Sequence, residues 1–247
     1  MLQNIYTIWL REMIKFVRAK SRIISSLALP FFWLAIVGIG FASSFKLPDM
    51  NYLNFFAPGI VGMVVLFTSI FSSISVIIER QFGFLKEILV APISRSSIVI
   101  GKALGSATVS LITAFLMILI AFAMGIVTIN YGIFLALASI VLGSLCFSSI
   151  GLILAAKMRS MEGFHMVMTF LVMPIFFLSG ALFPLQNAPQ WMQIISYFNP
   201  LVYVVDILRL TLAGSGAFPL LFDISALAIY CIILLGIAVH VFRKSIY

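Results

Sequence analysis

The sequence predicts an all-α membrane protein with six transmembrane helices, built as a single domain over residues 1–247. Of its 247 residues, 63% are hydrophobic and only 9% are charged, whereas soluble domains carry about 25% charged residues. Six apolar runs are each long enough to cross a hydrocarbon core of about 30 Å as a helix that rises about 1.5 Å per residue. The predicted spans are residues 23–44, 55–78, 103–128, 133–156, 165–183 and 220–242.

The positive charges predict how these spans are oriented. Lysine and arginine are enriched in the cytoplasmic segments of membrane proteins. Of the 15 Lys and Arg residues, 13 fall in the N-terminal segment, the second-to-third and fourth-to-fifth connections and the C-terminus, which leaves Lys46 and Arg209 for the other side. Both termini are therefore expected in the cytoplasm. The net charge of +8 follows membrane topology and does not indicate nucleic-acid binding.

Residues 1–22 predict an amphipathic helix ahead of the first span. Basic residues recur there at spacings of 4, 3 and 4, and apolar residues recur at helical spacing on the other face. A helix with two such faces lies in the membrane interface. It serves either as a plain anchor or as a lever that also contacts a cytoplasmic partner. The residues singled out are Trp9, Arg11, Lys15, Arg18 and Arg22.

Residues 79–102 combine charges with an amphipathic stretch between the second and third spans. Phe82 and Leu85 begin a pattern of helical spacing that predicts a short helix over 82–91. Pro92 limits this helix because it disfavours helical geometry in the residue before it. Ser94 is then a predicted N-cap for the helix that leads into the third span. The short helix either rests on lipid headgroups or transmits its displacement to the two spans that it joins.

Residues 184–219 predict a re-entrant segment at the outer face. The run 201–213 would span only about 20 Å and contains Asp206 and Arg209. A short helix that dips in from the outer side explains both features. A second short helix is expected over 190–198, with a proline on each side. Asp206 and Arg209 are three residues apart on one helical face, so we expect them to pair with each other.

Missing residues exclude two enzyme classes. A P-loop needs Gly-x-x-x-x-Gly-Lys-Ser/Thr, but Ser96 stands at the first glycine and Ala103 at the hydroxyl position. An intramembrane serine protease of the rhomboid type needs its serine and histidine within about 3 Å, whereas Ser179 and His240 belong to opposite ends of their spans. We therefore expect a non-catalytic chain without a cofactor or metal of its own.

The segment 79–102 resembles the signature region of the ABC-2 type permeases, the membrane subunits of ABC exporters. The family pattern is an acidic residue, then Gly-Thr-Leu-Glu, an aliphatic stretch, Pro, Ser/Thr-Arg and a later Gly-Lys. The chain follows this pattern except at Phe84 and Lys86. Residues 56–59 (Phe-Ala-Pro-Gly) resemble the family's Pro-Gly at the second span. Residues 178–209 resemble the daunorubicin-exporter and nodulation-factor-exporter branch, with Ser-Gly, Phe-Pro, Pro-x-Trp, Asn-Pro and Asp-x-x-Arg in order.

The resemblance implies three groups of working residues. The N-terminal helix, with the residues named above, would be a connecting helix. The ATPase-coupling group would be Glu79, Arg80, Phe82, Gly83, Leu85, Lys86, Glu87, Leu89, Pro92 and Arg95. The outer gate would be Ser179, Gly180, Phe183, Pro184, Trp191, Asn199, Pro200, Asp206 and Arg209.

The resemblance also implies partners and a function. The partners would be a cytoplasmic ABC ATPase that binds ATP and Mg, a second permease copy as homodimer or heterodimer, and the lipid bilayer of the plasma membrane. The chain would export a hydrophobic or amphiphilic substrate, drug or lipid-like, along a path lined by Phe, Met and Leu of the second and fifth spans. The alternatives are a glycan or lipopolysaccharide exporter subunit, an ATP-independent channel or secondary transporter, and a non-transporting anchor or assembly factor. The Gly101-x-x-x-Gly105 spacing permits a helix contact, although it is also common by chance.

Overall fold

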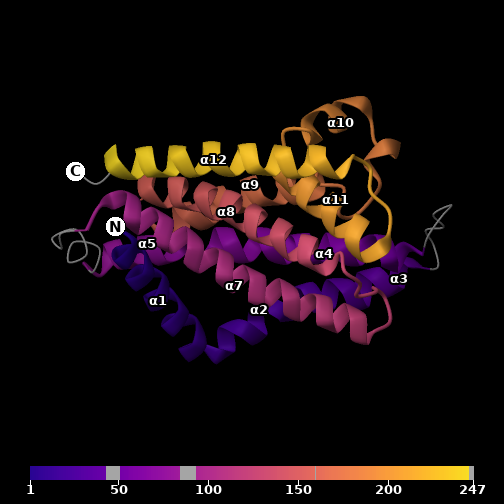
Figure 1. Ribbon diagram of the computed structural model, residues 1–247, viewed down its shortest axis with the longest axis horizontal. Coiled ribbons are helices and arrows are strands. Elements are labelled where there is room, and N and C mark those ends of the chain that lie inside the picture. The colour runs from indigo at the N-terminus through magenta and orange to yellow at the C-terminus, as the bar shows by residue number, and fades with distance from the viewer. Residues whose placement is uncertain (43–50, 84–92, 159, 245–247) are drawn as a thin grey trace.

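A computed structural model of the chain describes residues 1–42, 51–83, 93–158 and 160–244. Over these residues the protein is helical, and its long helices lie side by side in one bundle (Figure 1). The N-terminus and the end of α12 lie at one end of the bundle, which we call the proximal end, and α10 lies at the opposite, distal end. The elements are α1 (Leu2–Arg18), α2 (Lys20–Phe32), the π-helical turn η1 (Trp33–Gly38), α3 (Ile39–Ala42), α4 (Tyr52–Ser72), α5 (Ile74–Gln81), α7 (Arg95–Ala123), α8 (Ile133–Lys157), α9 (Met161–Phe177), the 3₁₀ turn η2 (Leu185–Asn187), α10 (Gln190–Ser196), α11 (Pro200–Ala213) and α12 (Leu220–Lys244).

The N-terminal helix is shorter than predicted. Ala19 leaves helical geometry, with φ −94° and ψ 63°, and the chain changes direction there between α1 and α2 (Figure 1). The sequence had suggested that Arg22 belongs to the amphipathic helix, but in the structure it belongs to α2. The first span is confirmed over Ile23–Ala42. Pro30 lies inside it, and the π-helical turn that follows is consistent with the amide hydrogen that proline lacks.

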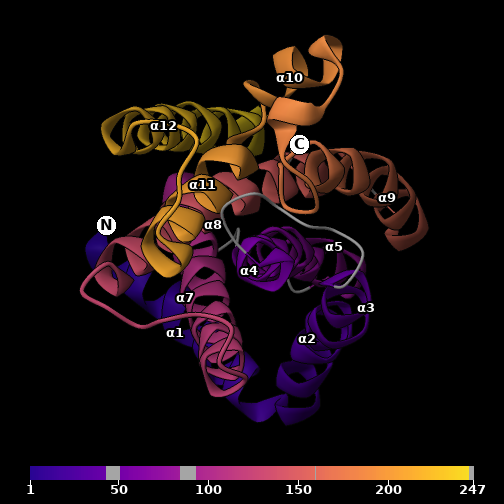
Figure 2. The same cartoon turned by 90° about the vertical axis from the view of Figure 1, so that its right-hand side faces the viewer.

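Helix α4 forms the centre of the bundle. Every residue from 55 to 66 is buried, as expected of a helix that is apolar on all sides. Figure 2 shows α4 in the middle, with α7, α8 and α11 on one side and α2 on another. Ser73 separates α4 from α5, and the two helices together form an apolar stretch from Tyr52 to Gln81. The predicted second span, 55–78, is confirmed and extends further toward the proximal end.

Helix α7 begins where the sequence predicted a cap. The Ser94 hydroxyl accepts a hydrogen bond from the Ser97 amide at 3.3 Å, which confirms Ser94 as the N-cap. The helix then runs for 29 residues, so it starts well ahead of the predicted span at residue 103. The fourth and sixth predicted spans are confirmed as α8 and α12, each of 25 residues.

The fifth span is shifted from its prediction of 165–183. Helix α9 has 17 residues, which corresponds to about 25 Å. It starts earlier because the Ser160 hydroxyl accepts from the Gly163 amide at 3.1 Å, and it ends at Phe177, ahead of a turn in which Gly180 has φ +73°. The two short helices predicted next are confirmed as α10 and α11, which meet at 89°.

Candidate functional site

Five charged side chains meet at the proximal end, where α1 crosses α5 and α7. Glu79 Oε1 lies 2.7 Å from Lys15 Nζ and 3.1 Å from Arg11 Nη2. Its Oε2 lies 2.9 Å from Lys102 Nζ. Glu12 Oε1 completes the group, at 3.2 Å from Lys15 Nζ and 3.3 Å from Lys102 Nζ. We call these five residues the proximal ion network.

The centre of the network is buried. The side chains of Glu79 and Lys102 are each 5% exposed, whereas those of Arg11 and Lys15 are 37% and 39% exposed. Burial raises the pKa of Glu12, but the charges of Lys102 and Lys15 outweigh it and hold that pKa below its usual value. A buried charge is tolerated only when it is paired, so each buried member depends on the others.

Close packing holds α1 on α7 beside this network. A methyl group on Gly101 would lie 2.8 Å from Ile8 Cβ, and one on Gly105 would lie 2.9 Å from Glu12 Cβ. The predicted helix contact at these two glycines is therefore confirmed, since only residues without a side chain permit this approach. One turn further along, Trp9 Nε1 donates to the Thr108 hydroxyl at 3.0 Å.

Of the predicted coupling residues, some are turned inward and bind other helices, and Phe82 is exposed. Arg80 donates to the carbonyls of Ala156 and Met158 at 3.1 and 2.9 Å, and thereby caps the end of α8. Glu79 is also turned inward, so it ties α5 to α1 and is not available as an exposed docking residue. Phe82 is 73% exposed, directly after α5.

The other members of this group are placed as follows. Gly83 follows Phe82 with φ +82°, a backbone geometry that suits glycine. Arg95 donates to the carbonyl of Arg243 at 2.6 Å, which links the start of α7 to the end of α12. The helix predicted over 82–91 lies almost entirely outside the described residues, as do Leu85, Lys86, Glu87, Leu89 and Pro92.

At the distal end, Asp206 and Arg209 do not pair with each other. Arg209 Nη2 donates to the Gly180 carbonyl at 2.8 Å, and its guanidinium carbon lies 3.8 Å from the centre of the Phe55 ring. Asp206 accepts from the amide of Ala217 at 2.8 and 3.0 Å and from the next amide at 2.9 Å. The predicted ion pair is wrong because each side chain instead satisfies backbone groups of a neighbouring turn, which otherwise lack partners.

Asn199 joins α9 to α11. Its Oδ1 accepts from the Leu201 amide at 3.0 Å and caps α11, with Pro200 as the first helical residue. Its Nδ2 donates to the Ile175 carbonyl at 2.6 Å. The Ser179 hydroxyl donates to the Phe176 carbonyl at 2.6 Å and so stabilises the end of α9.

The remaining gate residues lie nearer the surface. Trp191 is 59% exposed, and Phe183 and Pro184 are partly exposed. Gly59 of α4 packs directly on the turn that follows α9. A methyl group on Gly59 would lie 2.8 Å from Ala181 Cα and would overlap the carbonyl oxygen of that residue. The predicted gate residues thus surround one region at the distal end, where α4 meets the turn after α9.

Three contact residues were absent from the predicted site groups, although Lys102 belongs to the Gly-Lys pair of the family pattern. Glu12 and Lys102 belong to the proximal ion network, and the Tyr52 hydroxyl donates to the Leu182 carbonyl at 3.2 Å. The spacing of three residues between Glu12 and Lys15 was a local signal that these two side chains could pair. In the part of the chain that the structure describes, no group of three or more His, Cys, Asp or Glu side chains could hold a metal ion.

The comparisons with known proteins identify the family. A family model described as "ABC-2 type transporter" matches residues 3–213. The chain belongs to the ABC-2 type transporter family. Similar proteins include the "Putative transport permease ycf38" of Cyanophora paradoxa, which is 32% identical over 223 residues, covering 87% of this chain and 76% of the relative. The "Nodulation protein J" of Rhizobium leguminosarum bv. viciae is 25% identical over 247 residues, covering 98% and 95%. The "Inner membrane transport permease YadH" of Escherichia coli (strain K12) is 25% identical over 232 residues, covering 92% and 89%.

In this ABC-2 permease, the family match covers both the proximal ion network and the predicted gate residues at the distal end. It ends at Ala213, the last residue of α11. The match shows a multi-pass transport permease, and the resemblance stated from the 79–102 and 178–209 motifs is confirmed.

Proposed function

We propose that this permease is the membrane-spanning subunit of an ABC exporter that moves a hydrophobic or amphiphilic molecule out of the cell. A separate cytoplasmic ABC ATPase would bind ATP and Mg and drive the transport. The proximal ion network is the observation that carries the proposal. It joins α1, α5 and α7 through ion pairs whose central members, Glu79 and Lys102, are buried. Residues 84–92 connect α5 to α7 in the sequence.

The network makes the three helices respond together. A force on the connection between α5 and α7 would act on Glu79, near the end of α5, and on Lys102, about two turns into α7. Because both side chains also pair with α1 through Arg11, Lys15 and Glu12, α1 would follow. Binding of ATP to the partner would then bias a two-state change from an inward-open to an outward-open form.

An apolar cavity supports the proposed class of substrate. It has a volume of about 240 Å³ and lies between α2 and α4. Leu29 and Pro30 line it from α2, and Met63 and Phe67 line it from α4. Phe and Met side chains adapt to varied apolar shapes. The sequence had suggested the second and fifth spans as the lining, and this cavity uses the first and second.

The arrangement of charges supports a cytoplasmic location for the proximal end. The N-terminus and the end of α12 lie there together (Figure 1), and so does the network with its three cations. Cytoplasmic segments are rich in Lys and Arg. We propose that both termini lie in the cytoplasm and that the permease belongs to the plasma membrane, and we expect a second permease copy to complete the transport path.

The test is copurification with the ATPase. A tagged permease, extracted gently from its native membrane, should bring with it a stoichiometric protein that carries a P-loop. Phe82→Asp should remove this protein, because Phe82 is 73% exposed at the expected docking end. Phe134→Asp is the matched control, since Phe134 is also 73% exposed but lies at the distal start of α8. Phe82→Asp combined with Leu85→Asp strengthens the perturbation.

The opposite result would direct attention to a different class of transporter. If no ATPase copurifies even after crosslinking, and substrate flux in vesicles continues without ATP, the permease works as an ATP-independent channel or carrier. Loss of the ATPase in both Phe82→Asp and Phe134→Asp would show general damage to the fold and would remove the support for docking at Phe82.

A further inference from the structure

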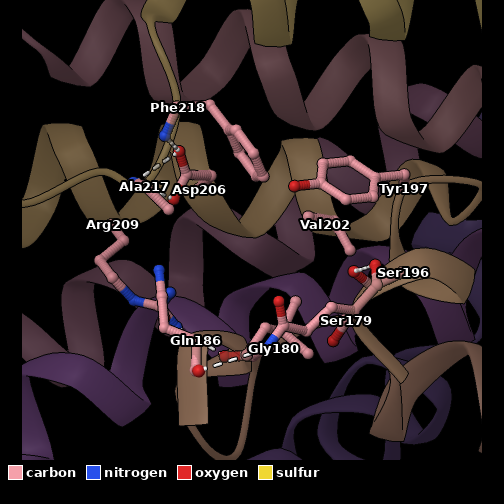
Figure 3. A pocket seen from close by; sticks show the side chains of 12 residues that line it. Ser179, Gly180, Gln186, Ser196, Tyr197, Val202, Asp206, Arg209, Ala217 and Phe218 are labelled. Atoms are coloured by element: carbon pink, nitrogen blue, oxygen red, sulfur yellow. Dashed lines mark hydrogen bonds between the residues drawn. The ribbon is translucent and has the colours of Figure 1, made fainter. Parts of the chain in front are cut away.

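A polar cavity of about 200 Å³ lies at the distal end, away from the apolar cavity described above. It is bounded by the turn after α9, by α10 and α11, and by the connection from α11 to α12 (Figure 3). Pockets that enclose whole drug-sized ligands measure about 300–1,000 Å³. This cavity therefore suits one headgroup and not an entire amphiphile. Its polar lining includes Ser179, Gln186, Gln193, Ser196, Asp206 and Arg209.

Arg209 brings unused hydrogen-bond donors to the cavity. One of its nitrogens, Nη2, donates to the Gly180 carbonyl at 2.8 Å, while the Phe55 ring covers a face of the guanidinium. Nη1 donates to no acceptor among the described residues, whereas Nε has no partner and is enclosed by protein. An oxygen atom of a bound group could accept from Nη1. In Figure 3 the guanidinium points toward Gln186, across the cavity.

The cavity also offers acceptors, and the two charged side chains that line it are of opposite sign. Asp206, which is 3% exposed, supplies a carboxylate opposite the charge of Arg209, and no other charged side chain among the described residues lines the cavity. The Gln193 amide nitrogen donates to the carbonyls of Gln186 and Ala188 at 3.3 and 2.9 Å, so its own oxygen is left as an acceptor. A bound phosphate or carboxylate would meet the carboxylate of Asp206 and could not donate to these acceptors.

We propose that this cavity binds an uncharged, hydroxyl-bearing headgroup such as a sugar ring. A hydroxyl both donates and accepts, so it can serve Arg209 and the oxygens of Gln193 and Asp206 together. Tyr197 and Phe218, whose rings lie 5.8 Å apart edge to face, provide an apolar wall. This proposal rests on the proposed function only for the source of the headgroup. The headgroup would belong either to the exported amphiphile or to a sugar that reaches the outer face from solution.

The test is binding to the purified permease in lipid nanodiscs without any ATPase, so its failure is distinguishable from failure of ATP-driven export. The protein carries 5-fluorotryptophan, and fluorine NMR follows Trp191 of α10, assigned by Trp191→Phe. The probes are octyl glucoside below its micelle concentration, octyl phosphate with the same chain, and glucose alone. We expect octyl glucoside to shift the Trp191 signal with saturation and to bind at least about 3-fold tighter than octyl phosphate.

Matched variants locate the binding. Gln186→Ala should weaken octyl glucoside about 3- to 10-fold, the effect of one lost hydrogen bond, and Arg209→Lys should weaken it at least as much. Gln190→Ala is the control, because Gln190 is exposed in the same helix as Trp191 but does not line the cavity. Since Gln186 is exposed, its variant tests the site even if Arg209→Lys fails to fold.

The outcomes separate as follows. A shift by glucose alone at similar concentration supports a sugar taken from solution, and a shift by octyl glucoside only supports a headgroup carried by a membrane-bound chain. Tighter binding of octyl phosphate would overturn the proposal in favour of an anion site. Equal effects of Gln186→Ala and Gln190→Ala would overturn it as well, because they would indicate nonspecific partition of the alkyl chain.

Discussion

Replacing Glu79 by glutamine should weaken the attachment of α1 to the bundle. Glu79 contacts three cations, at 2.7, 2.9 and 3.1 Å, and its side chain is 5% exposed. Glu79→Gln keeps the size of the side chain and removes its charge. Lys15 and Lys102 then keep the carboxylate of Glu12, whereas Arg11 loses its ion-pair partner in the network.

The expected destabilisation follows from the burial of each partner. Breaking a buried ion pair by removing one member costs about 3–5 kcal/mol. Arg11 and Lys15 are more than a third exposed, so water screens them and their contribution is small. Lys102 is buried but keeps Glu12 at 3.3 Å, which favours the lower limit of about 3 kcal/mol. For a protein of this size, that loss lowers the melting temperature by about 6–12 °C.

The assay combines thermal unfolding of the purified permease with hydrogen exchange of the α1 amides. Glu79→Gln should lower the melting temperature and the protection of α1. Arg18→Gln is the control, because Arg18 is an exposed cation on the same helix with no contact to the network. Lys102→Met combined with Glu79→Gln should be less harmful than the sum of the two single changes, since the buried charges are then removed together. A melting temperature within about 2 °C of the parent, with unchanged α1 protection, would refute the network as the attachment of α1.

Three further predictions concern both ends of the bundle. Gly59→Ala should cost about 1–3 kcal/mol because the backbone of Ala181 blocks the added methyl group, whereas at Gly236 of α12 nothing lies within 4 Å of it. A larger drop in melting temperature for Gly59→Ala than for Gly236→Ala would confirm this. Asn199→Ala should lose about 0.5–2 kcal/mol for the cap alone, and Asn199→Asp should recover part of it by keeping the acceptor; equal melting temperatures would contradict the capping role. The pKa of Glu12 is lower in the folded protein than its unfolded value of 4.5. The stability that ionised Glu12 contributes should therefore be complete above pH 4.5 and be lost as the pH falls through the lower folded pKa. Glu12→Gln should flatten the dependence of melting temperature on pH in that range.

The long spans were predictable because each is a single apolar run of sufficient length. The glycine contact was predictable as a possibility, and the structure decides it by placing Ile8 against Gly101. The fifth span was misplaced because its ends depend on a serine cap and on the turn at Gly180, and neither affects the mean hydropathy that locates a span. Local chemistry, and not hydropathy, sets where such a helix begins and ends.

The ion contacts were the least predictable part of the site. Asp206 and Arg209 satisfied the spacing rule for a helical pair, but each found backbone partners in turns that local spacing does not describe. Lys102 pairs with Glu12, which lies 90 positions earlier in the sequence. A single sequence cannot show that α1 folds back across α7, so it cannot show which carboxylate neutralises a buried lysine.

The apolar stretch of α4 and α5 joins the distal end of the bundle to the proximal end. Gly59, packed against the turn at Ala181, and Glu79, at the centre of the proximal ion network, belong to the same apolar stretch from Tyr52 to Gln81. Twenty residues of helix separate them by about 30 Å. A displacement of Glu79 along the helix axis must therefore either reach the distal turn or be absorbed at Ser73, where α4 gives way to α5. Since Ser73 donates to the carbonyl of Ser148 in α8 at 3.3 Å, bending there would also disturb α8. Movement of the whole element against its neighbours is thus the simpler way to connect the proposed ATPase-docking end with the predicted gate residues.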